Sequence, residues 1–322
     1  MSNNNVLVVV DFSAWLYMTI FNAMNNWSKK NKAECNSLVK PAEETDQDNI
    51  PNLLVSETFK RELKTSVMKK LQSIDWILKR NCQDVLDIAD EIVIVFAEDD
   101  FVSNNFRRKL YPEYKAQRSL GNKSWDYGKA RDYVVNSILP ELDLYKKNGY
   151  IRIGVHGAEA DDVIAIMMQQ DRKHWAEKIL ISSDHDFCQI DGIRQFNVFG
   201  EEVVPWVDKK KGIRMTPEEV KIVKALCGDG ADNIPQCISR VGVKTAWKLC
   251  KDRPKLKELL KENAEAAKQF LLNRKLVDFD LIPAELKEEI QKEVDKKLAS
   301  FVSDSSSAGS NNENELFDLM SL

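Results

Sequence analysis

Three apolar runs of this sequence each end in acidic residues. They are NVLVVVDFS at 5–13, EIVIVFAEDD at 91–100 and EKILISSDHDF at 177–187, and a shorter run, YIRIGV, lies at 150–155. Continuous apolar runs rich in β-branched residues are typical of strands covered on both faces of a parallel sheet. Helical stretches separate the runs, so the sequence predicts an α/β fold with a mostly parallel sheet and helices on both faces.

A long amphipathic helix is predicted between the first two runs. Its apolar positions recur on one helical face, at Phe59, Leu63, Val67, Leu71, Ile74 and Leu78. The polar stretch from about residue 28 to residue 51 follows neither the helical nor the strand period, and we expect a surface insertion there.

The pattern changes to helices from Thr216 onward. TPEEVKIVKALCG has a threonine before proline, acids in the first turn and a glycine after the last, which are the signals of a complete helix. We therefore predict one unit at 1–207 and a smaller helical unit at 208–301. Residues 302–322 have the Ser/Asn-rich composition of a flexible tail.

Composition limits the class of protein. No apolar stretch approaches the ~18 residues of a membrane span, and the start MSNNN lacks the features of a signal peptide, so we expect a cytoplasmic monomer without membrane contact. The six cysteines show no zinc-type spacing, which argues against a structural zinc or a disulfide framework. The formal net charge is −4, yet cations cluster at 107–118, 209–214 and 240–253. Basic patches around an acidic centre suit a nucleic-acid enzyme.

The acidic residues are the main functional signal. Ligands of open parallel sheets bind beyond the carboxyl ends of the strands, which is where Asp11, the 98–100 group, Asp184 and Asp186 lie. GAEADDVIAIMM at 157–168 adds further acids at a helix start, where the helix dipole alone also favours them. Two carboxylates ~4 Å apart repel by about 4 kcal/mol at an effective dielectric of 20. Bridging cations with oxygen ligands, magnesium or manganese, are therefore expected. His185 should point away from this site.

Two segments predict contacts with nucleic acid. In FRRKLYPEYKAQR at 106–118, an aromatic residue stands beside cations, as expected for binding a single-stranded 5′ end, although a solvated basic face is the alternative. In CGDGADNIPQCISRVGVKTAWKL at 227–249, a Gly-rich turn carries Asp229 and Asp232, and Gly242 opens a helix whose amides can hold a phosphate. No Walker glycine precedes Lys244 at the right spacing, which excludes an ATP site.

The ordered motifs VVVDFS, FRRKLYPEYKAQR, EADD, SSDHDF, GDGADNIP and VGVKTA resemble the flap endonuclease and 5′-3′ exonuclease family over residues 5–250. Within it, the length and the lack of a polymerase domain resemble the stand-alone phage enzymes of the T-even RNase H type, which act in the bacterial host cytoplasm. The resemblance implies a PIN-like nuclease domain and an all-helical helix-three-turn-helix domain that grips duplex DNA.

The resemblance also implies roles for individual residues. It places two Mg²⁺ (or Mn²⁺) ions on a set of carboxylates, namely Asp11, Glu159, Asp161, Asp162, Asp184, Asp186, Asp229 and Asp232. Ala97 stands where the family has a further ligand, and the spacing to the arginine pair favours Asp100 over Asp99 as its replacement. A K⁺ ion is implied in the hairpin of the second domain, where Arg240 stands near the position of the first glycine.

The segment at about 101–123 resembles the helical arch of the family. By this resemblance Arg107 and Lys115 are catalytic residues that contact the scissile phosphate, and Tyr114 stacks on a base. The remaining predicted DNA contacts are Arg108, Arg118, Gly242, Lys244, Thr245 and Lys248.

ELFDLMSL at the end of the tail resembles peptides that dock on sliding clamps, and a weakly docked terminal turn is the alternative. We therefore expect a clamp that binds Leu316–Leu322, and single-strand-binding protein, as partners.

Together these features predict a metal-dependent 5′ nuclease that removes RNA primers and 5′ flaps from duplex DNA. One alternative is a PIN-type ribonuclease for single-stranded RNA, which does not require residues 216–250. The other is a non-catalytic protein that binds DNA junctions, favoured by the missing acid at Ala97.

Overall fold

The computed structural model describes residues 4–39, 50–100, 105–117, 125–142, 150–170 and 175–308, with side chains as far as residue 299. Residues 101–104 and 118–123 of the predicted arch, including Arg118, and the predicted clamp peptide at Leu316–Leu322 lie outside these residues.

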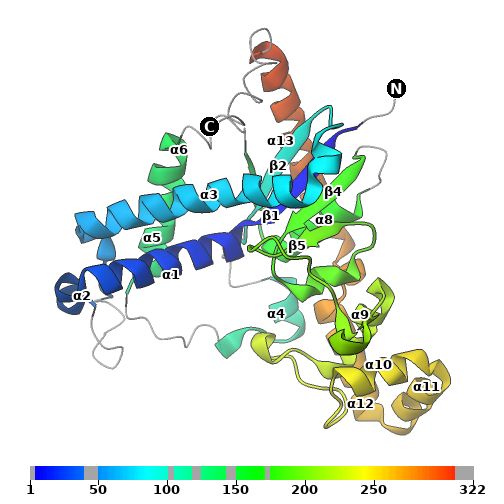
Figure 1. Cartoon of the computed structure of the whole chain (residues 1–322). Coiled ribbons are helices and arrows are strands. Elements are labelled where there is room, and N and C mark those ends of the chain that lie inside the picture. Colours follow the sequence, from blue (N-terminus) through cyan, green and yellow to red (C-terminus); the bar gives the residue numbers. More distant parts are fainter. Residues whose placement is uncertain are drawn as a thin grey trace.

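A five-stranded parallel sheet forms the centre of the molecule (Figure 1). The strands lie in the order β3-β2-β1-β4-β5, and every neighbouring pair is parallel. Their bounds are β1 Val6–Asp11, β2 Ile92–Ala97, β3 Ile151–Ile153, β4 Glu177–Ile181 and β5 Arg194–Phe196. The predicted α/β class is confirmed, and β5 is a strand that the sequence did not reveal.

Both faces of the sheet are buried, as the unbroken apolar runs predicted. Along β1, Val6, Val8 and Val10 belong to one apolar core, whereas Leu7 and Val9 belong to a second core on the opposite face. This alternation follows from the two-residue repeat of a strand.

Helices α1 (Phe12–Lys30) and α3 (Glu57–Leu86) cover the first face and lie side by side (Figure 1). The predicted face of α3, from Phe59 to Leu78, is buried, which confirms the helical pattern. Shorter helices α5 (Tyr127–Tyr133) and α6 (Leu139–Glu141) flank them, joined by a π-helical turn at Val134–Ile138.

The predicted surface insertion is partly helical, although its sequence shows no helical period. Residues 28–30 complete α1, and Lys32–Leu38 form the helix α2. Trp27 is buried and its indole N–H donates to Thr58 Oγ1 at 2.8 Å, so the end of α1 is fixed against the start of α3. Helix α2 itself buries no residue, so its sequence has no apolar face from which a helix could be predicted.

The second face carries α8 (Ala160–Gln169) and α13 (Ala284–Ala308). Ile290 and Val294 of α13 are fully buried in the core of the sheet. The predicted helical unit at 208–301 is therefore wrong at its end, because α13 belongs to the nuclease unit. An amphipathic pattern shows that a helix buries one face, but not against which core.

A smaller unit follows the sheet and has its own apolar core. It starts with the hairpin β6 (Trp206–Asp208) and β7 (Ile213–Arg214) and continues with helices α9 Pro217–Cys227, α10 Val243–Lys251, α11 Arg253–Glu262 and α12 Ala264–Val277. Helix α9 begins and ends as predicted, with a Thr216/Glu219 capping box and Gly228 after its last residue. Helices α9 to α12 lie together below the sheet in Figure 1.

Among the helices described here, none is long and apolar enough to cross a membrane.

Candidate active site

Two strand ends bring the first carboxylates together. Asp11 ends β1, and its Oδ1 accepts the Ala14 N–H at 3.0 Å while its Oδ2 accepts the Ser182 hydroxyl at 3.1 Å. Asp184 follows β4 and accepts the Asp186 N–H at 2.8 Å, which starts a 3-10 turn at His185–Gln189. His185 is exposed, as expected, but this turn rather than strand alternation directs it outward.

The acid contributed by β2 is Asp99 and not Asp100. Asp99 accepts the Ala160 N–H at 2.8 Å, and its charge raises the pKa of Asp11. Asp100 instead accepts the Gly157 N–H at 2.7 Å and lies 2.9 Å from His156 Nδ1. Counting residues along the chain could not reveal that the loop before α8 binds Asp100.

The start of α8 supplies three acids with different surroundings. Glu159 is the N-cap residue and shares a capping box with Asp162. Asp162 is completely buried, and Arg107 donates to both of its carboxylate oxygens, at 3.0 and 2.7 Å. We predicted Asp162 as a metal ligand, but these bonds make it the support of Arg107. Asp161 lies in the cleft between the two units.

Arg107 lies in α4 (Phe106–Leu110) and is 3% exposed. In addition to Asp162, its guanidinium contacts Glu159 Oε2 at 3.2 Å and donates to the Leu276 carbonyl at 2.8 Å. In this structure Arg107 is enclosed by protein groups, and its contact with the scissile phosphate stays a prediction. Arg107 is a positioning residue that joins the start of α8 to the end of α12.

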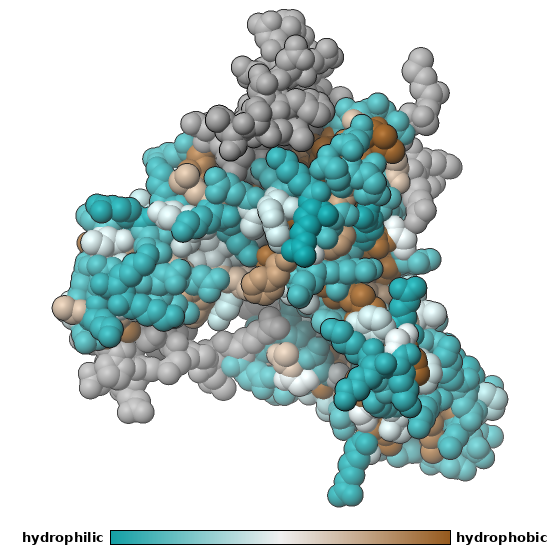
Figure 2. All heavy atoms as spheres, viewed as in Figure 1, coloured by the Kyte–Doolittle hydropathy of each residue, from teal (hydrophilic) through white to brown (hydrophobic). Residues whose placement is uncertain are grey.

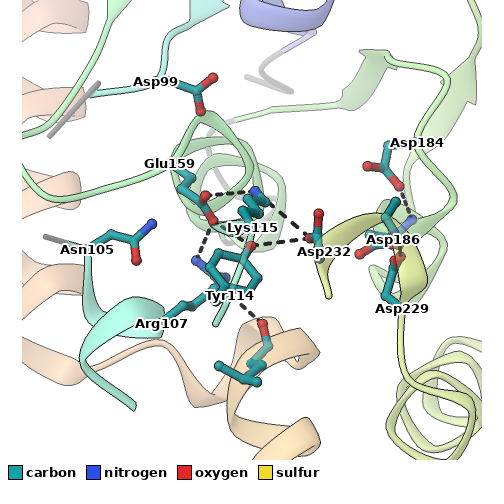
Figure 3. A network of polar contacts seen from close by, with 12 residues as sticks. Asp99, Asn105, Arg107, Tyr114, Lys115, Glu159, Asp184, Asp186, Asp229 and Asp232 are labelled. Carbon is teal, nitrogen blue, oxygen red and sulfur yellow. Dashed lines mark hydrogen bonds and ion pairs between the residues drawn. The ribbon is translucent and has the colours of Figure 1, made fainter. Parts of the chain in front are cut away.

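Tyr114 is also buried, at 3% exposure, contrary to its predicted role as a stacking residue. Its hydroxyl lies 2.9 Å from Glu159 Oε2 and 3.3 Å from Asp232 Oδ2. Lys115 Nζ contacts Glu159 Oε1 at 2.7 Å and Asp232 Oδ2 at 3.9 Å. These contacts form one network across the two units (Figure 3). The described part of the arch, 105–117, packs onto the site.

Asp186 and Asp229 face each other on the other side of Figure 3, and Lys224 of α9 bridges them. Asp229 is fixed by a tight turn, because Gly228 has φ +65° and an added Cβ would lie 2.3 Å from the Ile234 carbonyl oxygen. Only glycine fits such a position. We did not predict Lys224, whose signal was its place one helical turn before the GDG turn.

The electrostatics of the site reflect crowded negative charge. Burial, together with the charges of Asp99 and Asp184, raises the pKa of Asp11 to about 6, although hydrogen bonds oppose the shift. Burial raises the pKa of Asp161 well above its usual range, and Asp11 and Asp184 add to the shift while Lys115 opposes it. Burial also raises the pKa of Glu159, but Arg107 and Lys115 outweigh it, and the net pKa is lowered.

These carboxylates fit a hard divalent cation by their chemistry. All of them offer oxygen, and burial together with the neighbouring charges of Asp99 and Asp184 raises the pKa of Asp11, which a bound cation would oppose. Lys115 and Lys224 form ion pairs with acids of this group, so each places a positive charge beside the carboxylates. Within the described ranges, no three His, Cys, Asp or Glu side chains are already grouped as a ligand shell.

An exposed aromatic group lies beside the carboxylates. Tyr17 of α1 is 52% exposed, and its ring centroid lies 4.3 Å from that of Phe21 and 5.5 Å from that of Tyr127. Burial raises the pKa of Tyr127 to about 12, and Asp99 adds to the shift, which places Tyr127 near the site. Tyr17 lies six residues after Asp11, in the second turn of the helix that this acid caps.

The predicted phosphate-binding residues lie at the start of α10. Gly242 is the N-cap residue and no side chain caps the helix. Lys244, Thr245 and Lys248 are exposed, and Lys244 Nζ contacts Asp208 Oδ2 at 3.1 Å. Arg108, also predicted to bind DNA, is half-buried next to Arg107.

Residues 60–222, half of the chain, match the model of a family described as 5′-3′ exonuclease, N-terminal resolvase-like domain. The chain belongs to this 5′-3′ exonuclease family. A 5′-3′ exonuclease of Buchnera aphidicola subsp. Acyrthosiphon pisum is 32% identical over 160 residues, which are 48% of this chain and 51% of that protein. A thermostable DNA polymerase I of Thermus thermophilus is 33% identical over 171 residues, or 52% of this chain and 19% of the polymerase. The chain thus spans about half the length of the first relative and about a fifth of the second.

The fold is similar to that of a solved structure. The D15 protein of phage T5 aligns with a TM-score of 0.55 at 17% identity, covering 91% of this chain and 98% of that one. This agreement extends over the sheet and the helical unit together, so the predicted PIN-like architecture with a second helical unit is confirmed.

Replacing Arg107 should destabilise the protein strongly. Arg107→Met leaves the carboxylate of Asp162 buried without its partner, at a cost of about 3–5 kcal/mol in the free energy of unfolding, measured by urea denaturation. Arg108→Met, which changes the neighbouring half-buried arginine, serves as the matched control. Equal losses for the two variants would contradict the assigned role of Arg107.

The raised pKa of Asp11 predicts that this residue lowers the free energy of unfolding when chelator removes divalent metal. The size of the loss depends on pH. Between its unfolded pKa near 4 and its folded pKa of about 6, the folded state binds more protons, so the stability contributed by Asp11 falls as the pH rises. At pH 7, Asp11→Asn should therefore unfold with a free energy higher by up to about 3 kcal/mol, and the gain should disappear near pH 4. A variant that is less stable than wild type at pH 7 would contradict this assignment.

Proposed function

We propose that this chain is a divalent-metal-dependent, structure-specific 5′ nuclease. It acts on branched or nicked duplex DNA with RNA or DNA 5′ ends and removes primers and 5′ flaps during replication. The observation that carries this proposal is one cleft lined by acids of both units, Asp161 and Asp186 from the unit that contains the sheet and Asp229 and Asp232 from the helical unit. Membership of the exonuclease family supports it, as does a structure described as T5 D15 flap endonuclease with DNA and metal ions.

Two groups of carboxylates would hold two Mg²⁺ or Mn²⁺ ions. The first consists of Asp11, Asp99, Asp161 and Asp184, and the second of Asp186, Asp229 and Asp232, with Glu159 between them. When bound, such ions activate a water for attack on a phosphodiester and stabilise the leaving oxygen. T5 5′-exonuclease, which shares this fold, is described with divalent metal ions.

The chain's own residues orient these groups. Ser182 holds one oxygen of Asp11, and Arg107 fixes Asp162 and Glu159. Lys115 Nζ reaches Glu159 and Asp232 across the two units, and at this place its charge can offset that of a substrate phosphate. No side chain needs to act as a covalent nucleophile.

The start of α10 is the proposed grip on the duplex. Its amides have no side-chain cap and face solvent together with Lys244 and Thr245, which suits a phosphate. Arg240 has φ +64°, a conformation that glycine normally adopts. The K⁺ ion, the sliding clamp and single-strand-binding protein stay predictions.

Cleavage of a 5′-labelled flap substrate tests the proposal. Wild type with Mg²⁺ should release the flap, leaving 5′-phosphate and 3′-hydroxyl ends, whereas Asp184→Asn and Asp11→Asn should lose at least about 10²-fold in kcat because the cation site is incomplete. The matched control is Asp191→Asn, an exposed acid in the loop before β5.

Three outcomes would refute this function. They are no cleavage by wild type, equal cleavage by the site variants, and activity restricted to single-stranded RNA. The last would favour the PIN-type ribonuclease, and binding of the flap substrate without cleavage would favour the junction-binding protein.

The exposed ring of Tyr17 is our candidate for stacking on a base beside the scissile bond. Tyr17→Ala should raise KM for a flap substrate by roughly 5- to 100-fold, since a base–aromatic stack contributes about 1–3 kcal/mol. Tyr17→Phe keeps the ring and should match wild type. Unchanged steady-state kinetics for Tyr17→Ala would remove the residue from the substrate path.

A further inference from the structure

The hairpin of β6 and β7 presents a concentrated positive charge that the proposed active site does not use. Its turn is Lys209–Lys211, and Arg214 follows in β7. All four side chains are exposed, and Asp208 is the acid within this stretch. Like charges at consecutive positions repel each other and add nothing to a core, and they stand out in a chain with a net charge of −4. Such a turn is suited to a polyanion.

One carboxylate ties this turn to the helix start that we propose as the duplex grip. Asp208 Oδ1 accepts the Lys211 N–H at 3.4 Å, and Asp208 Oδ2 contacts Lys244 Nζ at 3.1 Å. The hydrogen bond and the charge of Lys244 lower the pKa of Asp208, and strand β6 packs against α10. The lysine turn and the first turn of α10 are thus held side by side.

The hairpin has a second feature that suits nucleic acid. Trp206 and Arg214 are direct partners across the two strands. Trp206 is 38% exposed although it is a large aromatic residue, and Arg214 is exposed next to it. An aromatic ring beside a guanidinium on an open surface offers both apolar and ionic contact to a sugar-phosphate chain. In the view of Figure 2 the surrounding lobe is mostly hydrophilic, with few isolated apolar residues.

We propose that the β6–β7 hairpin is a second phosphate-binding element that extends the footprint of α10 along the same duplex. The partner is double-stranded DNA, contacted through its backbone without base specificity. Lys209, Lys210 and Lys211 each neutralise a phosphate, while the amides of α10 bind a neighbouring stretch. This inference rests on the proposed function, because it assumes a duplex at the start of α10.

The test is the salt dependence of DNA binding by the full chain. Dissociation constants for a nicked duplex are measured without divalent metal over a range of KCl concentrations, for wild type, for K209Q/K210Q/K211Q and for a matched control, K69Q/K79Q/K292Q. The control removes three exposed lysines of α3 and α13. The slope of log K against log salt should fall by about 0.9 for each lost phosphate contact, so by up to about 2.7 in the hairpin variant, and should stay unchanged in the control.

Flap cleavage separates this inference from the proposed function. The hairpin variant should keep the wild-type kcat at saturating DNA in low salt and show a raised KM, because these lysines lie outside the carboxylate site. A slope equal to that of wild type, or an equal fall in the control, would overturn the hairpin contact while flap cleavage by wild type still supports the nuclease. Wild type that neither binds nor cleaves duplex DNA would overturn the proposed function itself.

Discussion

Mutual repulsion among carboxylates gathered around the buried Asp11 is the constraint on which the rest of this structure depends. The parallel sheet brings Asp11, Asp99 and Asp184 to the same ends of its strands, and burial together with their proximity raises the pKa of Asp11 to about 6. The chain limits this cost with cations of its own, since Lys115 and Lys224 each contact two acids. A fold that needed only stability would not gather these groups.

The same cations join the two units. Lys115 precedes the second unit in sequence but contacts Asp232 within it, and Lys224 reaches back from α9 to Asp186. Arg107 adds a bond to the Leu276 carbonyl at the end of α12. The candidate active site and the interface between the units therefore coincide, so the start of α10 has a fixed position relative to the carboxylates.

The parts predictable from sequence were those set by local periodicity. Apolar runs gave the four predicted strands and their buried faces, and the position of each acid after a strand gave most of the site. Side-chain surroundings were not predictable, because Tyr114 and Arg107 are buried by α12, more than 150 residues away. A basic, aromatic segment shows the same sequence pattern whether it binds DNA or packs against a protein core. Helix α13 was assigned to the wrong unit for the same reason, since its apolar stripe does not specify its partner.

Thermal unfolding of the metal-free protein during a Mg²⁺ titration at pH 8 tests the central claim most directly. If the converging carboxylates form a cation site, the midpoint should rise steadily with Mg²⁺ concentration in wild type, as binding to the folded state alone requires, and much less in Asp11→Asn. Lys69→Gln, which changes an exposed residue of α3, should behave as wild type does. A wild-type midpoint that does not respond to Mg²⁺, or one that rises equally in Asp11→Asn, would contradict the account.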